Sequence, residues 1–175
     1  MLRKIILVHL LLFLHNITQA QSKTGILNFK EVDSFVLSVK YENDIMKLSD
    51  DLTSPYAEDI YKVRAIFKWI TNNINSGKEI VMPDCDEEDD CILKTRTWEN
   101  NYLKKILNRK KAIADGYSKL FKKLCDLNYI QCELIIGYAR TKPYQIGNNM
   151  GVNHSWNAVM LGADWYYLDV TWAAG

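Results

Sequence analysis

The chain has 175 residues, of which 48% are hydrophobic and 25% charged. This length allows one domain with a sizeable core, and the composition excludes the collagen-like, low-complexity and disordered classes. The formal net charge is +1, so there is no basic field to favour nucleic acid as a partner.

The first twenty residues have the pattern of a secretory signal peptide. Arg3 and Lys4 give a positive start, residues 5–14 are almost continuously apolar, and Ala20 ends the segment. The apolar run of about ten residues is too short to span a bilayer, which needs roughly twenty. We therefore expect cleavage after Ala20 and a secreted or periplasmic product without a stable membrane span. An uncleaved N-terminal anchor is the alternative.

The mature chain is expected to hold a polar lead-in at 21–40, loose up to about residue 33, and a folded domain at 41–175. Apolar residues at helical spacing and alternating apolar residues between turn signals predict the elements. Helices are predicted over 61–74, 98–107 and 115–127, and strands over 132–139, 156–161 and 165–170. Helices followed by an antiparallel sheet indicate the α+β class.

Residues 75–97 are predicted to form a long loop or insertion with an acidic cluster at 84–90. Such carboxylate density can bind calcium. The cluster lacks the ligand order of an EF-hand, so we favour a solvated acidic loop. We expect neither a bound metal nor a cofactor.

Four cysteines permit disulfides in an exported chain, with three possible connectivities. They are Cys85, Cys91, Cys125 and Cys132. The first two bracket the acidic cluster and make a plausible local pair. Buried free thiols are the alternative for all four, because an unpaired cysteine packs as a small hydrophobic residue.

The last two predicted strands bring a histidine and an aspartate together. A two-residue turn at 162–163 sets a register that puts Trp156 opposite Asp169. His154 shares a face with Trp156, so His154 and Asp169 are diagonal neighbours, roughly 7–8 Å apart at the backbone. A hydrogen bond between them suits a general base whose tautomer is fixed by a carboxylate. A polar pair without a catalytic role is the alternative.

A thiol enzyme with this base needs a nucleophile at a helix N-terminus, where the dipole stabilises a thiolate and backbone N–H groups contribute to an oxyanion hole. The helix predicted over 115–127 gives that position to Ala114. A methyl group cannot attack an acyl carbon. Cys125 lies roughly 16 Å further along the helix at 1.5 Å per residue, and Ser118 is expected to face the packing surface or the cleft wall.

Three motifs in this order resemble those of bacterial transglutaminase-like proteins. Residues 112–118 read AIADGYS, similar to the family pattern Gly-Val-Cys-x-Gly-Tyr-Ala. Residues 153–159 read NHSWNAV, similar to a His-x-Trp-Asn segment, and residues 165–172 read WYYLDVTW, similar to Trp-Tyr…Asp-x-Thr-Trp. The resemblance implies a papain-like core and a Cys-His-Asp triad. It gives His154 the role of base, Asp169 that of its orienter, and Ala114 the nucleophile position.

The family resemblance implies transglutaminase, peptidase or amide-cleaving activity, although some members are non-catalytic. With Ala114 in place of cysteine, we expect a secreted pseudoenzyme that binds a peptide or protein ligand in the former active cleft. Two alternatives stay open: an active thiol acyltransferase or peptidase represented by a Cys-to-Ala variant, and a structural or interaction module of a longer secreted protein. Family domains usually continue with further strands, so at Gly175 we expect an incomplete sheet or a fragment.

Overall fold

A computed structural model of the chain describes residues 28–77, 88–140, 142–147 and 151–175, and its α+β class agrees with the sequence prediction. The helices are α2 (Lys30–Val36), α3 (Ile45–Thr53), α4 (Asp59–Asn73), α5 (Glu88–Arg109), α6 (Ala114–Leu127) and α7 (Val170–Ala174), with a 3-10 turn η1 (Pro143–Gln145). The strands are β1 (Asn75–Ser76), β2 (Lys111–Ala112), β3 (Cys132–Gly137), β4 (His154–Leu161) and β5 (Asp164–Leu168).

The strands β3, β4 and β5 form an antiparallel sheet in that order. Leu161 pairs with Asp164 across the tight turn between β4 and β5, which confirms the predicted register. Gly162 in this turn has a φ of 66°, in the left-handed region where glycine has no Cβ penalty. The turn therefore fixes which residues of the two strands share a face.

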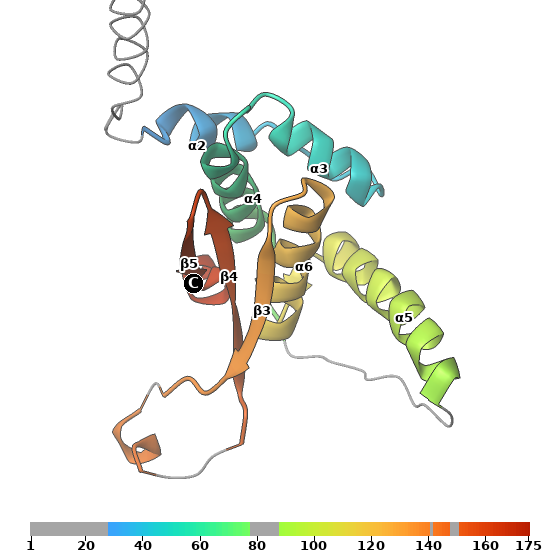
Figure 1. The fold of residues 1–175 in the computed structure, drawn as a ribbon, viewed down its shortest axis with the longest axis vertical. Helices are drawn as coiled ribbons and strands as arrows, with labels where there is room; N and C mark the ends of the chain where they lie inside the picture. The colour runs from blue at the N-terminus through green and yellow to red at the C-terminus, as the bar shows by residue number, and fades with distance from the viewer. Residues whose placement is uncertain (1–27, 78–87, 141, 148–150) are drawn as a thin grey trace, which may run out of the picture.

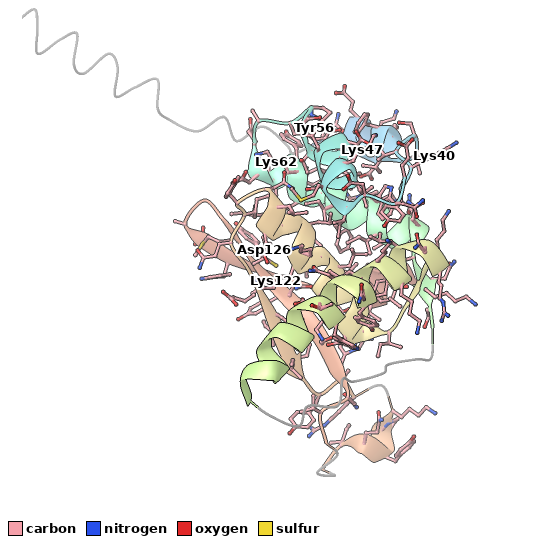
Figure 2. All side chains as sticks on the ribbon, turned by 90° about the vertical axis from the view of Figure 1, so that its right-hand side faces the viewer. Lys40, Lys47, Tyr56, Lys62, Lys122 and Asp126 are labelled. Atoms are coloured by element: carbon pink, nitrogen blue, oxygen red, sulfur yellow. The ribbon has the colours of Figure 1, made fainter. Side chains whose placement is uncertain are left out.

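Helix α6 lies at the centre of the fold. It packs against β3 and β4, while α5 lies along its other side (Figure 1). Figure 2, turned by 90°, shows α5 in front of α6. Leu120, Phe121 and Leu124 of α6 are fully buried, as the amphipathic spacing of this segment predicts. The buried apolar face of α6 therefore sets the position of the sheet relative to the helices.

Two expectations about irregular segments are wrong. The lead-in predicted up to residue 33 includes the first turn of α2, because Val32 and Val36 lie one turn apart and both are buried in the core that α2 shares with α4. The loop predicted over 75–97 ends where α5 begins at Glu88. The helix predicted over 98–107 is the second half of α5. The helix extends beyond the predicted part because, once packing fixes one part of a helix, each added residue gains a hydrogen bond without a new nucleation cost.

The C-terminal segment also differs from the prediction. The strand predicted over 165–170 ends at Leu168, and Asp169 becomes the N-cap of α7 because its side chain accepts a hydrogen bond from the Trp172 N–H. A short parallel pair between β1 and β2, which was not predicted, joins Asn75 to Lys111 just before α6 begins. Both features hold chain segments next to the first turn of α6.

Cys125 and Cys132 are buried free thiols in the structure, which corresponds to the alternative that we considered for the cysteines. Cys85 and residues 84–87 lie outside the described residues, as do the side chains of residues 88–91. The predicted leader at 1–20 also lies outside them. Within the described part of the chain, no helix is both long enough and apolar enough to cross a membrane.

Candidate functional site

His154 and Asp169 are in contact, which the predicted hairpin register allows. His154 Nε2 lies 2.7 Å from Asp169 Oδ2, and the side chain of His154 is only 8% exposed. The last paired residues of the hairpin are Asn157 and Leu168, so Asp169 follows directly after the ladder. Because a carboxylate accepts a hydrogen bond, this contact puts the proton of the neutral imidazole on Nε2 and leaves a lone pair on Nδ1.

Asp169 uses its second oxygen to organise the backbone that follows it. Asp169 Oδ1 accepts a hydrogen bond of 3.0 Å from the Trp172 N–H, and α7 begins at the next residue. A side chain that caps a helix typically stabilises it by about 1 kcal/mol. The same carboxylate therefore orients His154 and starts the helix that carries Trp172.

Two indole rings lie against the imidazole. The ring of Trp172 stacks on His154 with centroids 5.1 Å apart, and Trp156 stacks with centroids 6.0 Å apart. Aromatic contacts of this kind hold a ring orientation more tightly than burial alone. His154 is thus fixed by one hydrogen bond and two ring contacts.

Gly137 allows Trp156 to lie where it does. A Cβ at Gly137 would lie 2.5 Å from Cη2 and 3.0 Å from Cζ3 of the Trp156 indole. The strand pairing puts Gly137 opposite His154, so the ring of Trp156 crosses the strand diagonally. Only a residue without a side chain leaves room for this arrangement.

The His154–Asp169 pair opens into a groove with a volume of about 330 Å³. Its lining is mostly aromatic or apolar. The imidazole of His154 and the carboxylate of Asp169, which also line it, are hydrogen-bonded to each other. The lining residues are Tyr138, Ala139, His154, Trp156, Tyr167, Leu168, Asp169 and Trp172. Apolar walls with a few convergent polar groups are typical of binding sites.

Ala114 is the first residue of α6, which begins one residue before the predicted start at 115, and Ala114 does not line the groove. Ile113 at the N-cap supplies no side-chain hydrogen bond to the first turn. One turn further on, the Ser118 hydroxyl donates to the Ala114 carbonyl over 3.0 Å and lies 3.2 Å from the Ser155 hydroxyl. Since Ser155 is the neighbour of His154, these contacts tie the first turn of α6 to the start of β4.

Neither alternative nucleophile considered from the sequence is available. Ser118 is 1% exposed and its hydroxyl is held by the contacts just described. Cys125 is fully buried, and a hydrogen bond with Cys132 together with burial raises its pKa well above the usual value for a thiol. A buried thiol with a raised pKa is unreactive.

Sequence reasoning missed several residues of the groove. Tyr167 could have been predicted from the hairpin register. It pairs with Ala158 and therefore lies on the same face of the sheet as Trp156. Trp172 was visible only as part of a motif, since nothing indicated a helix after Asp169. Tyr138 and Gly137 depend on the pairing of β3 with β4, whose long connection fixes no register.

The antiparallel sheet packed on a central helix, with His154 at the start of β4 and Asp169 directly after the end of β5, defines a papain-like α+β fold. A sequence profile of the transglutaminase-like superfamily matches residues 46–170. The chain belongs to this superfamily, and the resemblance seen in the sequence motifs is confirmed.

Individual relatives agree with this assignment. The chain is 31% identical to human Kyphoscoliosis peptidase over 149 residues, which are 84% of this chain and 21% of that protein. It is 29% identical to Hillarin of Drosophila melanogaster over 164 residues, which are 90% of this chain and 18% of that protein. The chain thus spans about a fifth of the length of these relatives.

A solved structure supports the fold alone. The periplasmic domain of TgpA from Pseudomonas aeruginosa superposes with a TM-score of 0.50 at 14% sequence identity, covering 85% of this chain and 49% of that domain. At this identity the likeness concerns the arrangement of helices and strands.

The role of Gly137 leads to a first prediction. Gly137→Ala should displace the Trp156 ring and with it the ring current felt by His154, because the added methyl overlaps the indole. The imidazole proton signals of His154 in an NMR spectrum should shift. Gly151→Ala is the control, since a Cβ there meets nothing within 4 Å. Unchanged His154 signals in Gly137→Ala would show that Trp156 does not hold this ring.

Proposed function

We propose that this transglutaminase-like domain is non-catalytic and holds a peptide or an amide-bearing segment in the groove beside His154. The observation that carries the proposal is the alanine at residue 114, where the family pattern has its nucleophile. The nearby hydroxyl of Ser118 and the thiol of Cys125 are both buried and hydrogen-bonded. Without a nucleophile, no acyl-enzyme can form.

The groove suits a peptide segment for two reasons. Its aromatic side chains Tyr138, Tyr167 and Trp172 are 55%, 74% and 60% exposed, so they offer apolar area that a partner can cover. Nδ1 of His154 can accept a hydrogen bond from an amide N–H, because Nε2 is occupied by Asp169. The name of one relative, Kyphoscoliosis peptidase, favours peptides as the class of ligand.

An active enzyme is the second candidate, and the intact His154–Asp169 pair favours it. An oriented histidine is the part of a thiol enzyme that deprotonates the nucleophile. Under this hypothesis the domain functions with cysteine at residue 114, and the sequence described here is a variant that lacks it. A purely structural module is the third candidate, in which the pair only stabilises the hairpin.

We also propose that the protein is exported and cleaved after Ala20. Support comes from the basic start, the short apolar run and the small residue at the end of the segment 1–20. N-terminal sequencing of the protein secreted from its producing cells should read Gln21 as the first residue. Recovery of the protein only in membrane fractions, with Met1 retained, would instead identify an uncleaved anchor.

The binding proposal predicts weaker ligand binding in groove variants. With carbobenzoxy-glutaminyl-glycine as the probe, His154→Ala and Trp172→Ala should each lower the affinity by about tenfold or more, because truncating a central contact residue typically costs 1–2 kcal/mol. Titration calorimetry measures this. Tyr129→Ala is the matched control, since this aromatic residue is 99% exposed at the opposite end of α6. Equal affinity in all three variants would leave His154 and Trp172 as structural residues.

The catalytic question has a separate test. The unmodified protein should release no ammonia from the same probe, and Ala114→Cys should restore turnover if the second candidate is right. Turnover by the unmodified protein would contradict the non-catalytic proposal, and the variant Cys125→Ala would then show whether that thiol carries it. Turnover that appears in Ala114→Cys and vanishes on adding His154→Ala would establish His154 as the base.

A further inference from the structure

The first turn of α6 carries an acidic side chain beside residue 114. Asp115 is the second residue of the helix, and its side chain is 25% exposed. A helix N-terminus has the equivalent of about half a positive charge, which favours an anion there. A carboxylate in the same turn offsets that field. Without compensation, the end of α6 would not attract a thiolate or a polarised carbonyl oxygen.

Lys119 lies one turn further along α6 and compensates this charge. Its Nζ is 3.0 Å from Asp115 Oδ2, and the side chain is 21% exposed. The same ammonium lies 5.2 Å from the ring centroid of Trp98 and 5.9 Å from that of Tyr102. Those two rings are stacked with centroids 4.9 Å apart. Lys119 is therefore held by a carboxylate on its own helix and by an aromatic pair on α5.

Helix α5 lies close enough to α6 to make this environment partly dry. A Cβ at Gly116 would lie 2.7 Å from Ile106 Cδ1 and 2.9 Å from the hydroxyl oxygen of Tyr102, so the phenol reaches the first turn of α6. Burial, together with the charge of Asp115, raises the pKa of Tyr102 to about 12. The field of Asp115 is therefore felt at the first turn of α6 and is not fully screened by water.

We propose that Lys119 is a positioning residue that keeps the amino terminus of α6 electropositive by neutralising Asp115. This inference rests on the proposed function, in which the groove beside His154 holds the ligand, and the contact between Ser118 and Ser155 joins the start of α6 to the strand that carries His154. Lys119 touches neither the ligand nor the imidazole and acts through the potential at residue 114. The aromatic pair on α5 keeps its ammonium beside Asp115 instead of in bulk water.

A second ion pair on the same helix provides a matched control. Lys122 and Asp126 have the same four-residue spacing and the same distance of 3.0 Å, and they lie in the C-terminal half of α6 (Figure 2). Removing Lys122 deletes the same charge from the same helix two turns away from residue 114. A difference in thiol pKa between the Lys119 and Lys122 variants therefore reports the position of the lost charge relative to residue 114, and not the loss of a charge as such.

The test uses a thiol introduced by Ala114→Cys as a probe of the local potential. Its pKa follows from the rate of iodoacetamide alkylation against pH, measured by mass spectrometry on the peptide that contains residue 114. Adding Lys119→Met should raise this thiol pKa by about half a unit to one unit, because a neighbouring charge shifts a pKa by that order in a partly exposed site. Adding Asp115→Asn to Ala114→Cys should lower the thiol pKa. The variant that carries Ala114→Cys, Lys119→Met and Asp115→Asn together should have a thiol pKa close to that of Ala114→Cys alone.

The other titratable groups on the elements around this turn stay constant across the series. Among the described residues they include Lys111 on β2, Tyr102 on α5, Tyr117 on α6, His154 on β4 and Asp169 before α7. Lys119→Arg keeps the charge and should preserve the thiol pKa, which separates the electrostatic role from a packing role. Circular dichroism melts check that each variant is folded at the pH values used.

Two results would overturn the proposal: an unchanged thiol pKa in the folded Lys119→Met variant, or an equal shift in Lys122→Met. The thiol pKa can be read whether or not any ligand binds or any turnover occurs. A shift in Lys119→Met together with no binding of carbobenzoxy-glutaminyl-glycine would therefore reject the proposed function while supporting the role of Lys119.

Discussion

The carboxylate of Asp169 forms two hydrogen bonds with groups from different elements. One oxygen binds the imidazole of His154 at 2.7 Å, and the other accepts the N–H of Trp172 at 3.0 Å. The first bond selects the tautomer of the histidine, and the second starts α7. Because α7 returns the indole of Trp172 to the face of the imidazole, each bond supports the geometry of the other. Loss of this carboxylate would loosen the base and one wall of the groove together.

The position of α6 relative to this pair depends on a buried polar side chain of β4. Asn157 is fully buried, and its amide donates to the Ser118 carbonyl over 3.1 Å and to the Glu133 carbonyl over 3.3 Å. One side chain on β4 thereby joins α6 and β3. A buried amide is costly unless it is hydrogen-bonded, so these directional contacts favour one alignment of helix and sheet over others with similar apolar contact. The start of α6 is held in place beside the strand that carries His154.

The predictable part of the site is the part that short-range rules control. A two-residue turn fixes register, and a period of two assigns faces, so the contact between His154 and Asp169 followed from the positions of turn and strand. The buried stripe of α6 followed from helical spacing, which put residue 114 at its beginning. Both arguments span few residues and involve one dominant constraint.

The rest depended on competition between local preferences and tertiary contacts. Val170, Thr171 and Trp172 are residue types common in strands, yet the capping side chain of Asp169 and the packing of α7 on α4 and α6 favour a helix there. The register between β3 and β4 has no short turn to set it, so the approach of Trp156 to Gly137 could not be predicted. The beginning of α5 was hidden for a similar reason, because a polar sequence gives little periodic signal to extend a helix.

The charges around α6 bear on two possible roles of a domain with alanine at residue 114, that of a scaffold and that of a binding domain. A fold that serves only as a scaffold needs the core and the hairpin, and it gains little from a lysine held between a carboxylate and two rings, since ion pairs with exposed character contribute at most about 1 kcal/mol. A site that receives the carbonyl of an amide still benefits from an electropositive helix end, with or without a thiol. The arrangement of Lys119, Asp115, Trp98 and Tyr102 is therefore one that the binding role we propose would use and that a scaffold alone would not need.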